Sequence, residues 1–232
     1  MPKRKKIVVL SGAGISAESG LRTFREMGGL WEEYDVMEVA SPQAWERDPE
    51  LVTKFYNERR KQLINSQPND GHLILHQLEE HFDVEIITQN VDDLHERAGS
   101  TKVLHLHGEL RKARSTVDPS LVYELEDWEL TPDSKCEKGS RLRPHIVWFG
   151  EEVPAISKAV EIVCKADILI IVGTSMNVYP AAGLIDYAPS SCPIYIIDPN
   201  EVNMSSFGNR NFIRKKASIG MKELYQILIS NS

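Results

Sequence analysis

Short hydrophobic runs alternate with amphipathic stretches along most of this 232-residue chain. Six runs rich in β-branched residues predict strands: Ile7–Leu10, Val84–Thr88, Val103–Leu106, His145–Phe149, Ile168–Val172 and Ile194–Ile197. Four stretches with helical spacing lie among them: Leu51–Ile64, His72–Phe82, Ala155–Cys164 and Ala181–Tyr187. Because the strand candidates are continuously apolar, both faces of their sheet must be covered. The pattern predicts an α/β fold with a Rossmann-like, doubly wound parallel sheet.

Two segments depart from this alternation and predict a second, smaller lobe formed by insertions. Residues 20–70 have helical and loop character without a strand, and residues 111–143 are polar and weakly periodic. We expect one domain over residues 1–232, with a large lobe of about residues 1–25, 70–110 and 144–232 and a small lobe of about residues 26–69 and 111–143. A cleft between lobes is a common place for a ligand.

Composition narrows the class of protein. The chain is 41% hydrophobic and has a formal charge of -7 without a strongly basic stripe, so no nucleic-acid partner is expected. The apolar run Ile7–Leu10 is too short for a secretory signal or a membrane span. Cys136, Cys164 and Cys192 lie far apart and favour a reducing compartment. We expect a cytoplasmic protein without a membrane partner, and a monomer.

A glycine loop follows the first predicted strand directly. Gly12, Gly14 and Ala17 form a G-x-G-x-x-A pattern before a predicted helix. Glycines there allow a tight turn and let the backbone approach a pyrophosphate. A glycine turn that merely closes a strand explains the pattern about as well. A dehydrogenase would also need a second strand that presents an acid about 20 residues later. Residues 24–31 contain no such strand, so hydride transfer is disfavoured.

Five longer motifs in order make the chain similar to the sirtuin family, and they span nearly its whole length. They are Gly12–Arg25 (GAGISAESGLRTFR), Thr88–Gly99 (TQNVDDLHERAG), His105–Leu110 (HLHGEL), Leu142–Glu151 (LRPHIVWFGE) and Gly173–Ser175 (GTS). The resemblance implies a single sirtuin-type domain that uses NAD as a co-substrate and removes acyl groups from the lysines of proteins or peptides. The products would be free lysine, nicotinamide and O-acyl-ADP-ribose.

The resemblance also assigns residues to the cofactor. The residues that would surround the pyrophosphate and the cofactor loop are Gly12, Ala13, Gly14, Ala17, Thr23, Phe24 and Arg25. Those expected around the nicotinamide and its ribose are Gln89, Asn90, Val91 and Asp92. The expected adenosine side consists of Gly173, Thr174, Ser175, Asp198, Asn200 and Ala217. Without the resemblance, Asn90 and Asp92 would be interpreted as a strand end and a helix cap, where Asn and Asp are favoured.

His107 would be the general base, with Asn90 and Asp92 beside it as further catalytic residues. Histidine titrates near neutral pH and suits the activation of a ribose hydroxyl. A lone histidine is more often structural, and only the motif favours the catalytic interpretation. Two other functions use the same motifs: an NAD-dependent protein ADP-ribosyltransferase, and a non-catalytic sensor of NAD or ADP-ribose.

The acyl-lysine site is expected at two places in the chain. Val147, Trp148 and Phe149 would flank an extended peptide, although a buried strand is the plainer explanation. Tyr56 and Arg59 are three apart on a predicted helix and can converge on one point. A sirtuin subclass has Tyr-x-x-Arg in its acyl pocket, which implies a succinyl, malonyl or glutaryl group rather than acetyl. Arg60 also lies near that face; the alternative for all of them is a solvated helix surface.

One departure from the family concerns zinc. Most members carry two C-x-x-C pairs after the catalytic histidine, whereas residues 111–143 contain only Cys136 and no histidine. Structural zinc needs four such ligands, so we expect no zinc. The small lobe must then be stabilised by packing, for which the candidates are Leu121, Val122, Leu125 and Trp128.

Overall fold

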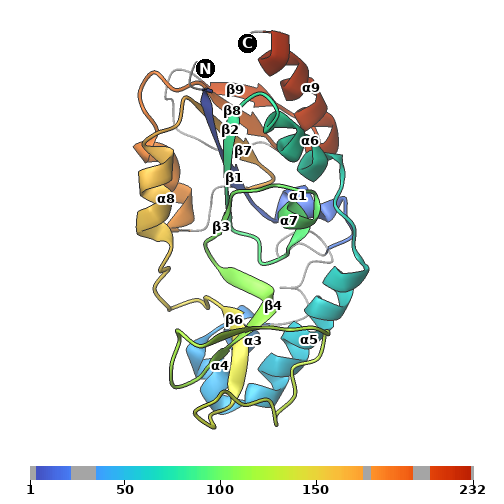
Figure 1. Cartoon of the computed structure of the whole chain (residues 1–232), viewed down its shortest axis with the longest axis vertical. Helices are drawn as coiled ribbons and strands as arrows, with labels where there is room; N and C mark the ends of the chain where they lie inside the picture. Colours follow the sequence, from blue (N-terminus) through green and yellow to red (C-terminus); the bar gives the residue numbers. More distant parts are fainter. Residues whose placement is uncertain (1–3, 22–34, 175–178, 201–209, 231–232) are drawn as a thin grey trace.

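The computed structural model describes residues 4–21, 35–174, 179–200 and 210–230 (Figure 1). The described residues form a parallel sheet with the strand order β3-β2-β1-β7-β8-β9. Its strands are β1 (Lys6–Ser11), β2 (Asp83–Thr88), β3 (Val103–His105), β7 (Ile168–Val172), β8 (Ile194–Ile197) and β9 (Arg210–Ile213). The predicted doubly wound α/β sheet is confirmed.

Helices cover both faces of this sheet. Side chains alternate along β1, so that Ile7 and Val9 face one core while Val8 and Leu10 face the other. Helices α6 (Asp70–Leu78) and α9 (Ala217–Ser230) close the first core, and α8 (Ile156–Val163) with the 3-10 helix η1 (Ala181–Tyr187) closes the second. The short helices α1 (Ala13–Ala17) and α7 (Leu94–Arg97) follow β1 and β2. Within the ranges described, no helix has the length and apolar character to span a membrane.

A second, antiparallel sheet lies at the opposite end of the molecule from the N-terminus (Figure 1). It consists of β5 (Val122–Glu124), β4 (Gly108–Ser115) and β6 (Leu142–Ile146) in that order. Helices α3 (Val36–Val39), α4 (Pro42–Arg47) and α5 (Pro49–Asn65) lie beside it. We call these helices and this sheet the small lobe. A hydrophobic core that includes Val52, Phe55 and Trp148 packs the small lobe against Leu94 of α7.

The structure corrects several sequence-based predictions. The expected strand His145–Phe149 is instead β6, Leu142–Ile146, and it pairs with β4 rather than with the parallel sheet. Alternation along it, with Leu142 and Ile146 buried and Arg143 and His145 partly exposed, is typical of an antiparallel strand with one covered face. The helix predicted over His72–Phe82 ends at Leu78.

Of the four residues expected to stabilise the small lobe, two pack in its core, and Trp128 is partly buried with the Lys61 ammonium 5.1 Å from the centre of its ring. Leu121 and Leu125 pack against the cluster around Ala113 and Leu130. Val122 is 39% exposed, so its predicted packing role is wrong. Successive side chains of β5 point to opposite faces of the sheet, and Val122 lies on the exposed face.

Candidate active site

The carboxyl ends of β1, β2, β7 and β8 meet at one edge of the sheet, and most of the predicted cofactor residues follow these ends. The chain order reverses between β1 and β7, because β2 and β3 extend the sheet on one side and β8 and β9 on the other. Doubly wound sheets bind ligands at such a switch point. Gly12, Gln89, Gly173 and Asp198 each follow one of the four strands.

The glycines of the loop after β1 pack against the loop after β7, backbone against backbone. The amide of Gly14 donates to the carbonyl of Gly173 at 2.8 Å. A Cβ atom on Gly12 would lie 2.7 Å from Thr174 Cβ, and one on Gly173 would lie 2.2 Å from the nitrogen of Ile15. Gly173 also has a φ of +63°, which favours glycine. The glycine pattern therefore has a packing reason in addition to the one that the sequence suggested.

Asn90 and Asp92 belong to a buried hydrogen-bond network centred on Ser16. The Asn90 amide donates to the Gly12 carbonyl and to Ser16 Oγ, both at 3.1 Å. The Ser16 hydroxyl donates to Asp92 Oδ2 at 3.0 Å, and the Leu94 amide donates to Asp92 Oδ1 at 3.2 Å. Burial raises the pKa of Asp92, although these two hydrogen bonds act in the opposite direction. The network fixes both side chains relative to the glycine loop.

Two buried histidines lie behind this network. His95 Nε2 lies 2.9 Å from Ser11 Oγ, and His72 Nε2 lies 3.5 Å from Ser16 Oγ. The two rings pack edge to face with centroids 5.0 Å apart. Burial lowers the pKa of His72 to about 4 and that of His95 well below its ordinary value. Both rings are therefore neutral at pH 7, and His72 contacts Ser16 without adding charge beside Asp92.

His107 is oriented as a base by the strand end beside it. Its Nδ1 lies 3.0 Å from the carbonyl oxygen of Gln89. A carbonyl only accepts, so Nδ1 carries the proton and Nε2 keeps its lone pair. Burial lowers the pKa of His107, and the bond to Gln89 only partly offsets this. The neutral form is therefore present at pH 7. Gln89 also donates to Thr174 Oγ1 at 3.1 Å, which ties the ends of β2 and β7 together.

His105 has a different environment. Its Nδ1 lies 3.0 Å from the Asn90 carbonyl and its Nε2 lies 2.8 Å from Glu96. Burial alone would lower the pKa of His105, but the Glu96 carboxylate outweighs it and raises the pKa. Both ring nitrogens are therefore engaged, which leaves His107 as the histidine of this motif with a free lone pair.

Tyr56 and Arg59 lie on α5 and interact with each other electrostatically. Tyr56 is buried, and burial raises its pKa to about 12 although Arg59 opposes this. Burial lowers the pKa of Arg59, while Tyr56 and the Asp92 carboxylate oppose that change. The guanidinium carbon of Arg59 lies 5.7 Å from the centre of the Phe55 ring. Trp148 Nε1 donates to the Tyr56 oxygen at 3.1 Å.

Arg60 does not share this position, in contrast to the prediction that it lies near the same face. Its side chain is fully buried. Its guanidinium donates to the Leu110 carbonyl, the Asn57 amide oxygen and the Trp128 carbonyl. The 100° step between adjacent helical positions turns it into the packing between α5 and β4.

The remaining predicted residues lie around this centre. The Val147 amide donates to the His107 carbonyl at 2.9 Å, Phe149 is 45% exposed, and Val91 packs against the small-lobe core. Asp198 is partly buried and accepts from the Asn200 amide, whereas Ala217 is buried at the start of α9. Ala13 and Ala17 are partly exposed on α1. Four predicted residues lie outside the described ranges: Thr23, Phe24, Arg25 and Ser175.

Several residues at the site were not singled out from the sequence. Ser16 could have been found, because it lies within the glycine motif. Arg143 and Glu151 lie within the motif Leu142–Glu151, but their pairing could not be inferred from it, and His72 gave no local signal. His72 has an ordinary position on an amphipathic helix, and the pair acquires its meaning from contact with Trp148.

The residues present fit NAD. Gly12, Gly14 and Gly173 leave no room for side chains at the ends of β1 and β7, and the backbone of Gly14 stays partly exposed at this edge of the sheet. Asp92 accepts two hydrogen bonds, and a carboxylate has about four acceptor sites. It therefore retains capacity for the amide group of a nicotinamide.

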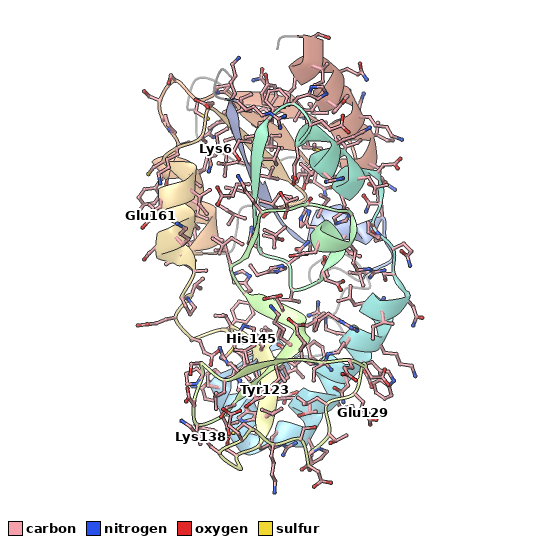
Figure 2. All side chains as sticks on the ribbon, viewed as in Figure 1. Lys6, Tyr123, Glu129, Lys138, His145 and Glu161 are labelled. Atoms are coloured by element: carbon pink, nitrogen blue, oxygen red, sulfur yellow. The ribbon has the colours of Figure 1, made fainter. Side chains whose placement is uncertain are left out.

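The residues present do not fit structural zinc. The thiol of Cys136 lies 3.1 Å from Ser140 Oγ, which in turn lies 3.0 Å from Ser115 Oγ. Asp118 is paired at 2.7 Å with Lys138, which lies in the small lobe (Figure 2). One thiol among hydroxyls, next to an ammonium group, is not a tetrahedral zinc ligand set. Among the residues that the structure describes, no group of three or more His, Cys, Asp or Glu could hold a metal ion. The absence of zinc stays a prediction.

Comparisons with known proteins show the family of this chain. The model of the Sir2 family, whose members are the sirtuins, matches residues 12–180. An NAD-dependent protein deacylase of Bacteroides thetaiotaomicron is 54% identical over 97% of this chain and 98% of its own. One of Helicobacter pylori is 52% identical over 97% and 96%.

Solved structures give the same result. A Sir2 homologue in complex with NAD has a TM-score of 0.88 at 42% identity and covers 98% of this chain and 91% of its own. A Sir2 protein bound to an acetylated peptide has a TM-score of 0.82 at 29% identity, over 97% and 93%. The family match spans well over half of the chain and the identity exceeds half over nearly its full length. This chain therefore belongs to the Sir2 family.

Proposed function

We propose that this protein is an NAD-dependent lysine deacylase that prefers acidic acyl groups. It transfers the acyl group of a lysine to ADP-ribose, and the products are free lysine, nicotinamide and O-acyl-ADP-ribose. Relatives that cover nearly the whole chain are named NAD-dependent protein deacylases. When bound, NAD supplies the ribose that accepts the acyl group and the nicotinamide that leaves.

The observation that carries the deacylase assignment is the orientation of His107. Its Nδ1 donates to the Gln89 carbonyl, so the lone pair of Nε2 is available to take a proton from a ribose hydroxyl. Asn90 and Asp92 are held by Ser16 near the same strand end, where they bind the nicotinamide side of the cofactor.

The peptide lies along residues 147–149. The Val147 amide bonds to the carbonyl of His107, which brings this segment beside the base. Phe149 exposes an apolar ring there, against which the methylene chain of an acyl-lysine packs.

The acidic preference rests on Tyr56 and Arg59. Burial raises the pKa of Tyr56 to about 12, so its phenol stays protonated and can donate to a carboxylate. Arg59 supplies the charge and the planar fork that match a carboxylate. An acetyl group has no carboxylate and gains neither contact.

The test is mass spectrometry of matched peptides that carry acetyl-, succinyl-, malonyl- or glutaryl-lysine, incubated with and without NAD. We expect NAD-dependent loss of the acyl group, one nicotinamide per lysine released, and the highest kcat/KM on an acidic acyl group. Equal activity without NAD contradicts the deacylase assignment. A peptide that gains ADP-ribose while it keeps its acyl group indicates ADP-ribosyl transfer, and NAD binding without turnover indicates a sensor.

A further inference from the structure

The phenol of Tyr56 has a fixed hydrogen-bond direction. Its oxygen accepts from the indole N–H of Trp148 at 3.1 Å, and both side chains are 2% exposed. An indole N–H can only donate, so the Tyr56 oxygen must be the acceptor of this bond. The phenol proton is therefore directed away from the indole and remains available to another acceptor. Trp148 thus decides how Tyr56 presents its proton.

A pair of charged side chains holds Trp148 in place. The guanidinium carbon of Arg143 lies 3.3 Å from the centre of a Trp148 ring. Arg143 also forms two parallel bonds to Glu151, at 2.8 Å to Oε1 and 3.1 Å to Oε2. Glu151 Oε2 accepts from the backbone amide of Trp148 at 2.8 Å. One carboxylate therefore fixes both the backbone of Trp148 and the cation that stacks on its ring.

This pair is protected from solvent. The side chains of Arg143 and Glu151 are 11% and 21% exposed. A two-pronged Arg–carboxylate contact of this kind defines orientation better than a single contact does. A cation over the ring also draws electron density from the indole, which strengthens its N–H as a donor. Arg143 is thus connected to Tyr56 through both geometry and charge.

We propose that Arg143 and Glu151 are positioning residues for the choice of acyl group. They hold Trp148 so that its indole N–H makes Tyr56 a hydrogen-bond donor toward an acidic acyl chain. This inference rests on the proposed function, since it explains how the Tyr56 side of the pocket distinguishes a carboxylate from a methyl group. Neither residue touches the acyl group itself.

Arg143→Gln removes the stacked cation and the two-pronged bond. We expect the ratio of kcat/KM for succinyl-lysine to that for acetyl-lysine to fall by about 2- to 12-fold. This magnitude corresponds to the loss of one neutral hydrogen bond, the one between Trp148 and Tyr56. Arg114→Gln is the matched control. Arg114 also contacts Glu151, at 3.3 Å, and donates to the Ile146 carbonyl, whereas the cation stacked on the Trp148 ring is Arg143. That variant should keep the wild-type ratio.

A double-mutant cycle separates positioning from a general loss of structure. In a Tyr56→Phe background, Arg143→Gln should no longer change the ratio, because the phenol through which it acts is gone. The indole N–H resonance of Trp148, assigned by its loss in Trp148→Phe, should shift both in Tyr56→Phe and in Arg143→Gln. If Arg143→Gln fails to fold, Arg143→Lys gives the same comparison, because lysine cannot form the two-pronged bond.

Three outcomes overturn the inference. Arg143→Gln could lower both kcat/KM values equally, its effect could persist in the Tyr56→Phe background, or the indole resonance could be unchanged. In each case the proposed deacylase function stands if the wild type still prefers succinyl-lysine. A wild type that prefers acetyl-lysine overturns the acidic preference, and with it the role assigned to Arg143 and Glu151.

Discussion

Removing the charge of Arg59 tests the acyl pocket most directly. The structure couples this guanidinium to the buried Tyr56 and to the Asp92 carboxylate. A charge-assisted hydrogen bond to an acidic acyl group contributes about 1.5–3 kcal/mol. Since about 1.36 kcal/mol corresponds to a factor of ten in kcat/KM, Arg59→Met should lower kcat/KM for succinyl-lysine by about 10- to 150-fold. Its effect on acetyl-lysine should be small, since an acetyl group offers no carboxylate.

The assay compares kcat/KM on otherwise identical acetyl and succinyl peptides at saturating NAD. The KM for NAD is measured in parallel, because Arg59 also interacts with Asp92. Arg60→Met is not a suitable control, since Arg60 is buried and donates to the Leu110 and Trp128 carbonyls. Lys54→Met is better, because it removes one positive charge from an exposed position of the same helix. Equal losses on both peptides in Arg59→Met, or the same loss of selectivity in Lys54→Met, would refute the reasoning.

Three further predictions concern the base, the glycine packing and zinc. His107→Ala should lose about 10²–10⁴-fold in turnover and should still bind NAD, as measured by calorimetry. Because burial lowers the pKa of His107, wild-type kcat should fall on the acid side with a midpoint below 6.5, the ordinary pKa of histidine. Near-normal turnover of the folded variant would exclude this role. Gly173→Ala should cost about 2–6 kcal/mol in urea unfolding, from backbone strain and a close contact. Gly150 also has a positive φ, but a Cβ atom there would meet open space, so Gly150→Ala should lower the free energy of unfolding by less. Equal losses of stability in the two variants would contradict the packing argument. Elemental analysis should find no stoichiometric zinc, and a chelator should not unfold the protein; one tightly held zinc per chain would refute this.

The sequence by itself determined the parallel sheet and the main catalytic candidates. A short, continuously apolar run such as Ile168–Val172 favours a strand covered on both faces, and the structure places this run as β7 with every residue buried. The resemblance of the motifs to the sirtuin family identified Asn90, Asp92 and His107 as candidates, and each lies within a few residues of a strand end. At such positions local sequence and location in the fold are closely linked.

The small lobe was harder to predict. Strand β4 contains Arg111, Lys112 and Arg114, and its sequence lacks the apolar run that marks β7. It becomes a strand because β5 and β6 pair with it on either side. Pairing of this kind depends on segments up to about 38 residues apart, as between Gly108 and Ile146. A local pattern does not contain that information.

Only the tertiary structure decided which polar side chains support the site. Ser16 and Asp92 are 76 residues apart, and Tyr56 and Trp148 are 92 residues apart, yet each pair is hydrogen-bonded. Tertiary packing also separated Arg59 from Arg60, which are adjacent in sequence but differ in burial and partners. The physical reason is that a buried polar group must find its partner wherever the packed chain brings one. Periodicity sets which residues are buried, whereas the packing of distant elements sets what they meet.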